Sequence, residues 1–171
     1  KKKRLPKDFR DLLTAGDLDR LKAVFDSHEL AAQDGQDGPT ALGMYGCPPE
    51  LAVWLIAKGA DPQFPQGYGN TALGRHISVG NVAMVDVLLD AGAPLEAVEG
   101  ARSQPPLHQA ARFLKPAVVR LLLDRGVNPL WRDHDGRTGL DWAIMATRNT
   151  DIPRLADVAQ ILHSAGLPIS N

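Results

Sequence analysis

A leucine recurs four times at nearly constant spacing, and this repeat constrains the fold more than any other feature of the sequence. Leu42, Leu73, Leu107 and Leu140 are separated by 31, 34 and 33 residues. Each lies two residues after a Thr or Pro and begins a short stretch that is typical of a helix. Such a period indicates stacked units that bury their apolar faces against one another.

A second apolar run follows each leucine and ends in a glycine, at Gly59, Gly92, Gly126 and Gly166. Glycine readily adopts the left-handed conformation that ends a helix, and a proline soon afterwards prevents the helix from resuming. Apolar residues within 82–89 are spaced as on one face of an amphipathic helix. Each repeat is therefore expected to contain two helices.

Clusters of turn-forming residues separate the units, at 34–38, 66–70 and 133–137. Upstream, residues 9–25 fit a degenerate first helix pair with Gly16 at the turn. We therefore expect one all-α domain over residues 1–171, a solenoid of about five helix pairs with short β-hairpin-like loops. Its approximate units are an N-terminal cap at 6–34, then 35–66, 67–100, 101–133, and 134–171 with an insertion.

The unit resembles the ankyrin repeat, whose period is about 33 residues and whose signature reads Thr-Pro-Leu-His-x-Ala. The third copy, residues 105–110, matches this signature best, while the other copies keep the Thr or the Leu and lack the His. The resemblance covers almost the whole chain. It implies a non-catalytic module that binds another protein.

Two repeats depart from the regular length. The first full repeat is two residues shorter than the third, and a Cys-Pro-Pro-Glu turn that begins at Cys47 places Pro49 at the first position of a helix. The last repeat is seven residues longer, with the extra length in 146–157, where Asp151 and Pro153 mark a helix start. This insertion is either a lengthened turn or a partner-specific element.

The resemblance also implies where a partner binds, because ankyrin partners usually lie against a concave face built from hairpin tips and first helices. Trp, Tyr and Arg are over-represented among residues that dominate binding energy, which favours the same face here. Carried over copy by copy, the first-helix positions are Met44, Arg75, Ser78, Gln109, Arg112, Phe113, Trp142 and Met145, and the hairpin tips are Asp37, Tyr68, Arg102, His134 and Arg137.

The aromatic residues have two readings. Trp142 either contacts a partner or packs into the enlarged last repeat, and Phe113 carries the same alternative. Trp54 falls on the apolar stripe of a second helix and is expected to be structural, while Phe64 and Trp131 precede hairpins and are expected to brace them.

Composition excludes several classes of protein. A lone Cys47 permits no intrachain disulfide, which fits a cytoplasmic location, and no apolar run approaches the roughly 20 residues of a membrane helix. The first ten residues hold six Lys or Arg and one Asp, whereas the rest of the chain holds 13 basic and 19 acidic residues. The basic tip, residues 1–4, is either a frayed solubilising end or a nuclear-import or nucleic-acid tail.

No catalytic motif is recognisable, and we expect no enzyme activity, cofactor, small-molecule substrate or membrane partner. His108 occupies the motif histidine position and His76 lies between helices, so both are expected to be structural. The cluster Asp133, His134 and Asp135 lacks the closed ligand shell of a metal site. Cys47 has no obvious His partner and is interpreted as a packing residue.

Three functions remain from the sequence. The first is a protein-binding module that acts through the concave face. A narrower version is an immunity or inhibitor protein that neutralises a toxin or enzyme. The third is a nuclear or nucleic-acid-associated adaptor that uses the basic tip, against which the acidic body argues because nonspecific affinity needs several phosphate contacts.

Overall fold

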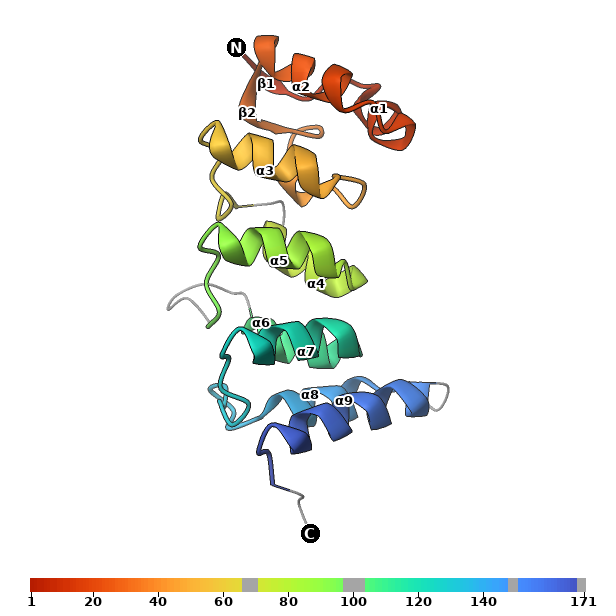
Figure 1. The fold of residues 1–171 in the computed structure, drawn as a ribbon, viewed down its shortest axis with the longest axis vertical. Coiled ribbons are helices and arrows are strands. Elements are labelled where there is room, and N and C mark those ends of the chain that lie inside the picture. The colour runs from red at the N-terminus through yellow and green to blue at the C-terminus, as the bar shows by residue number, and fades with distance from the viewer. Residues whose placement is uncertain (66–70, 97–103, 148–150, 169–171) are drawn as a thin grey trace. The chain divides into compact units, whose positions relative to one another are not determined.

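The computed structural model describes residues 1–65, 71–96, 104–147 and 151–168 (Figure 1). It divides into two compact units, Lys1–His76 with Ala83–Ala93, and Ile77–Val82 with Pro94–Asn171. The boundary between these units crosses two helices, α4 (Ala72–Val79) and α5 (Val82–Asp90). The other elements of the first unit are β1 (Lys2–Arg4), α1 (Phe9–Ala15), α2 (Leu18–Ser27), β2 (His28–Gln33), the 3-10 helix η1 (Ala41–Gly43) and α3 (Pro49–Ala57). The other elements of the second unit are α6 (Pro106–Arg112), α7 (Pro116–Asp124), α8 (Gly139–Ala146) and α9 (Ile152–Ser164).

The first unit begins with the helix pair that the sequence predicts between residues 9 and 25. Gly16 ends α1 with a φ of 71°, a left-handed conformation that favours glycine, and the Asp17 side chain then caps α2. The rings of Phe9 and Phe25 pack edge to face with their centres 6.1 Å apart, and both side chains are buried. These contacts hold α1 against α2.

The basic tip forms a strand, so both the all-α expectation and the frayed-end interpretation are wrong at this point. Strand β1 pairs in parallel with β2, and the Leu5 N–H extends the pairing by donating to the Gln33 carbonyl at 2.9 Å. Lys1 Nζ also donates to the Phe25 carbonyl at 2.6 Å. The side chains of β1 are exposed, whereas Leu5 is buried. The main chain of the tip is therefore part of the fold.

The first full repeat has only the short helix η1 in place of a complete first helix. Residues 34–38 form a turn closed by an antiparallel bridge between Gln33 and Thr40, as the hairpin signal predicts. Pro49 is the first residue of α3, in agreement with the sequence. Trp54 on α3 packs against Phe25, with ring centres 6.1 Å apart, and this contact gives it the expected structural role.

The second unit consists of two helix pairs in two layers, with α6 packed on α8 and α7 packed on α9 (Figure 1). Gly139, at the start of α8, lies so close to α6 that an added Cβ would be 3.5 Å from the Ala111 Cβ. Helix α8 begins with a reciprocal capping box between Thr138 and Asp141. Helix α9 begins after Asp151 with Pro153 in its first turn, as predicted, and is 13 residues long against nine for α7.

The two histidines that the sequence predicts to be structural lie in the core. His76 is 0% exposed and its Nε2 lies 2.8 Å from the Leu42 carbonyl; His108 is 1% exposed and its Nε2 lies 3.2 Å from the Trp131 carbonyl. Since a carbonyl oxygen only accepts, Nε2 carries the proton and donates in both rings. Burial lowers the pKa of both histidines, although each backbone hydrogen bond acts in the opposite direction. Both rings are therefore neutral parts of the packing.

The other chemical candidates are also used by the fold. Cys47 is 2% exposed, and burial raises its pKa to about 12, so its thiol is almost entirely protonated near neutral pH. Asp133 accepts hydrogen bonds from neighbouring backbone N–H groups. Within the described ranges, no three His, Cys, Asp or Glu side chains converge as metal ligands, and no helix combines the length and apolar character required to cross a bilayer.

Replacing Leu5 by Ala should lower the free energy of unfolding by about 2 kcal/mol, because it removes buried apolar surface beside the β1–β2 pairing. Urea unfolding followed by circular dichroism measures this loss. Arg4→Ala, on the exposed side of β1, is the control and should change the free energy by less than about 0.5 kcal/mol. Equal unfolding midpoints for Leu5→Ala and the unchanged chain would mean that the tip is frayed after all.

The unfolding free energy should also fall as the pH decreases below about 6.5. The unfolded chain then takes up protons at His76 and His108, which the folded chain resists because burial lowers both pKa values. The free energy of unfolding should fall by at most about 1.4 kcal/mol per pH unit for each histidine. Above about pH 6.5 the two histidines should cause no further loss. Urea unfolding between pH 5 and pH 7 tests it, with His108→Gln expected to reduce the slope.

Candidate partner-binding surface

The second unit brings four of the predicted binding residues together. Arg112 ends α6 and Phe113 follows it, Arg137 lies in the loop that precedes α8, and Trp142 lies on α8. The loop also supplies Asp133, which the sequence did not indicate as a binding residue. We call these five residues, Arg112, Phe113, Asp133, Arg137 and Trp142, the Trp142 cluster.

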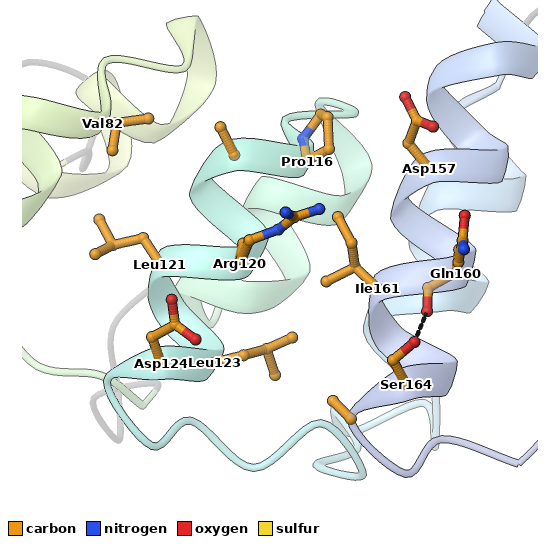
Figure 2. Close-up of a pocket in the computed structure, with 12 residues that line it drawn as sticks. Val82, Pro116, Arg120, Leu121, Leu123, Asp124, Asp157, Gln160, Ile161 and Ser164 are labelled. Atoms are coloured by element: carbon orange, nitrogen blue, oxygen red, sulfur yellow. Dashed lines mark hydrogen bonds between the residues drawn. The ribbon is translucent and has the colours of Figure 1, made fainter.

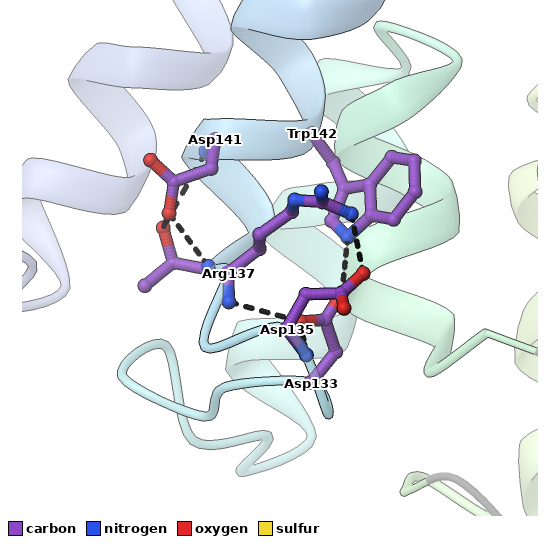
Figure 3. A network of polar contacts seen from close by, with 6 residues as sticks. Asp133, Asp135, Arg137, Asp141 and Trp142 are labelled. Atoms are coloured by element: carbon purple, nitrogen blue, oxygen red, sulfur yellow. Dashed lines mark hydrogen bonds and ion pairs between the residues drawn. The ribbon is translucent and has the colours of Figure 1, made fainter.

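Trp142 is held in place by a hydrogen bond to the loop before its helix. Its indole Nε1 donates to Asp133 Oδ2 at 2.7 Å, as Figure 3 shows. The side chain is half-buried, so one part packs and another part faces solvent. The ring is therefore partly packed in the last repeat, as one reading from the sequence expects, and contact with a partner stays a prediction for its accessible part.

The loop at 133–137 is organised around the Asp133 carboxylate. Asp133 Oδ1 accepts from the backbone N–H groups of Asp135 and Arg137, each at 2.9 Å, and the Asp133 N–H donates to the Arg137 carbonyl at 3.0 Å. Partial burial would raise the pKa of Asp133, but the hydrogen bonds from Arg137, Trp142 and Asp135 together lower it. The carboxylate is thus ionised and accepts hydrogen bonds from its own loop.

Two guanidinium groups lie over the Trp142 ring. The Cζ atoms of Arg112 and Arg137 are 5.5 Å and 5.3 Å from the ring centre, within the range of cation–π attraction. The Arg112 guanidinium also lies 5.6 Å from the Phe113 ring centre. Arg137 is paired with Asp135 at 2.6 Å, and Arg112 donates only a longer hydrogen bond of 3.3 Å to the Gln104 side chain.

Other predicted residues of this unit surround the cluster or lie apart from it. Met145 is 59% exposed and lies one helical turn after Trp142, on the same side of α8. Phe113 is 43% exposed. Gln109 is half-buried and donates to the Gln104 carbonyl at 2.9 Å, while Ser78 is half-buried on α4. The exposed apolar surface beside the cluster is therefore that of Phe113 and Met145.

In the first unit, Met44 was predicted to face a partner, and that expectation is wrong. Met44 is only 5% exposed because the chain leaves the short helix η1 at this residue in an extended conformation. The next residue, Tyr45, is 53% exposed instead. The corresponding residues of later repeats, Gln109 and Trp142, lie within complete α-helices and are half-buried.

Arg75 forms a second aromatic pair in the first unit. Its guanidinium carbon lies 4.7 Å from the centre of the exposed Tyr45 ring, and its Nε donates to the Gly43 carbonyl at 2.7 Å. Two further predicted binding residues, Tyr68 and Arg102, lie outside the described residues.

Sequence reasoning missed Tyr45 and Asp133 for identifiable reasons. No spacing signal pointed to Tyr45, because the leucine register assumes a complete first helix where only η1 forms. Asp133 was noted only as part of a possible cation cluster with its neighbours. Its position before the Gly136 turn was a signal for a side chain that organises a loop, as Asp often does.

A separate groove lies on the layer of second helices, between α7 and α9 (Figure 2). Its accessible volume is about 960 Å³, and it combines apolar side chains such as Leu121 and Ile161 with the charges of Arg120, Asp124 and Asp157. This mixed lining does not indicate a particular ligand. The groove is on the opposite layer from α6 and α8, which carry the Trp142 cluster.

Comparison with known proteins agrees with the repeat. The family profile described as "Ankyrin repeats (3 copies)" matches residues 40–133. The chain is 41% identical over 83 residues to the E3 ubiquitin-protein ligase hecd-1 of Caenorhabditis elegans. The aligned segment makes up 48% of this chain and 3% of that protein. It is 46% identical over 59 residues to the human neurogenic locus notch homolog protein 4. This aligned segment makes up 34% of this chain and 3% of that protein.

A putative ankyrin repeat-containing protein of Treponema pallidum is 32% identical over 115 residues, 67% of this chain and 34% of that protein. The alignments thus span between 3% and about a third of these three relatives. The profile match, in contrast, covers more than half of this chain and includes the leucine repeats from Leu42 to Leu107. Together with the stacked helix pairs, this match shows that the chain belongs to the ankyrin-repeat family.

Proposed function

We propose that the chain binds a protein partner through the Trp142 cluster, with apolar contact from Phe113 of the cluster and from the neighbouring Met145. Ankyrin repeats are generally protein–protein interaction modules and are typically non-catalytic. The single observation that supports this particular surface is the accessible Trp142 ring, braced by Asp133 and flanked by two arginines.

The physical basis of the proposal is that this surface is already ordered. A Trp whose indole N–H is fixed by a carboxylate loses little side-chain freedom when a partner covers it, so more of the contact energy remains as affinity. Trp and Arg are also the residues that most often dominate an interface. Gln109 and Gln104 offer polar groups at the edge of the cluster.

The activities of the relatives are not part of the proposal. The alignment with the ligase hecd-1 covers 3% of that protein, so its ligase function is not extended to this chain. The Treponema relative is described only as an ankyrin repeat-containing protein. Assays of the partner's activity with and without the chain show whether the partner is an enzyme or toxin that the chain inhibits.

The double variant Arg112→Ala/Trp142→Ala should weaken binding to the native partner by at least about tenfold, because it removes the indole ring of the cluster and one of the two guanidinium groups over it. Quantitative capture of proteins from the native source on the immobilised chain identifies the partner, and titration with the purified partner gives the affinity. Urea unfolding of each variant shows that the fold is retained.

The matched control is Ile152→Ala/Arg154→Ala, which removes an exposed apolar and an exposed cationic side chain from α9. This variant should bind as well as the unchanged chain. A partner that is lost with the α9 variant and retained with the cluster variant would show that the proposed surface is the wrong one.

A further inference from the structure

The acidic groups of the Trp142 cluster and its surroundings already have hydrogen-bond donors. Asp133 accepts from two backbone N–H groups and from the Trp142 indole. Asp135 is paired with Arg137 at 2.6 Å, and Asp141 accepts from the Thr138 N–H at 2.7 Å and from its hydroxyl at 2.8 Å. These carboxylates therefore serve the loop and the cap of α8 (Figure 3).

Arg112 is different, because its charge has no acidic partner among the residues that the structure describes. The side chain is exposed, and its hydrogen bond there goes to the neutral Gln104 side chain at 3.3 Å. Most of its N–H donors are consequently open to solvent. The other cluster arginine, Arg137, is neutralised by Asp135.

The Arg112 guanidinium also lies near two aromatic rings. Its carbon lies 5.5 Å from the Trp142 ring centre and 5.6 Å from that of Phe113. Attraction to a ring involves the face of the planar guanidinium, while the N–H groups on its edge remain suited to a carboxylate with two oxygens. The aromatic rings thus limit the freedom of Arg112 without using its donors.

We infer that Arg112 binds an Asp or Glu side chain of the partner, and that an apolar partner residue beside this acid covers Phe113 and Met145. The inference rests on the proposed function and specifies the chemistry of the segment that binds. Phe113 and Met145, 43% and 59% exposed, are the apolar neighbours that such a residue covers. An arginine covered by a partner without an acceptor would lose hydration with no compensation, and a carboxylate is the acceptor that matches both the charge and the paired N–H groups of a guanidinium.

A random peptide library displayed within a phage coat protein tests this chemistry directly, since it requires only the chain itself. Peptides selected on the unchanged chain are sorted by whether Trp142→Ala abolishes their binding, which identifies those that contact the cluster. We expect these peptides to be enriched in Asp or Glu next to an apolar residue. Because displayed peptides have no free carboxyl terminus, the enrichment reports on side chains.

For a synthetic peptide of this class, Arg112→Gln should weaken binding by about tenfold, with Arg112→Lys between the two. Changing the peptide acid to its amide should cause a similar loss, and combining both changes should add little, since each removes the same pair. Arg120→Gln, on the other layer of helices, is the control and should leave binding unchanged. Urea unfolding verifies that the Arg112 variants are folded.

Failure of the inference and failure of the proposed surface give different results. Trp142-dependent peptides that lack an acid, or that bind Arg112→Gln as well as the unchanged chain, overturn the inference and leave the proposed surface intact. A selection that yields no Trp142-dependent peptide also overturns it, and the capture experiment with Arg112→Ala/Trp142→Ala then decides separately whether the surface binds a partner.

Discussion

A helix pair has an apolar face that it cannot bury alone, and the rest of this structure depends on how neighbouring pairs cover it. In the second unit, α8 packs against α6, and Gly139 faces Leu107 and Ala111 at a distance where an added Cβ would make ordinary van der Waals contact. That packing places the first helices of two repeats side by side. It also brings Trp142, on α8, next to Arg112 at the end of α6. The candidate surface is therefore a by-product of the packing between repeats.

The helices were predictable because their signals are local. The glycines after apolar runs, exemplified by Gly59 and Gly126, adopt the positive φ values that end helices, and Pro49 begins a helix as its fixed φ favours. Strand β1 was not predictable, since main-chain pairing leaves little trace in a run of lysines. Met44 was misplaced because the leucine register assumed a complete first helix where only η1 forms.

The candidate site was predictable only as far as helix register determines it. Arg112 and Trp142 follow from their distance to the repeat leucines, because α6 and α8 are regular helices. The role of Asp133 depends on a loop conformation and on a side chain nine residues away, and no spacing rule contains that information. The pairing of Arg137 with Asp135 likewise required coordinates, as did the finding that Arg112 has no acidic partner among the residues that the structure describes.

The pairing of strand β1 with β2 depends on the main chain of the N-terminal residues and not on their side chains. Backbone N–H and C=O groups make the pairing with β2, and such bonds are indifferent to the side chains that the residues carry. The exposed side chains of Lys2, Lys3 and Arg4 can thus be exchanged for most others without loss of the strand. The pairing with β2 therefore does not account for the positive charge of this segment.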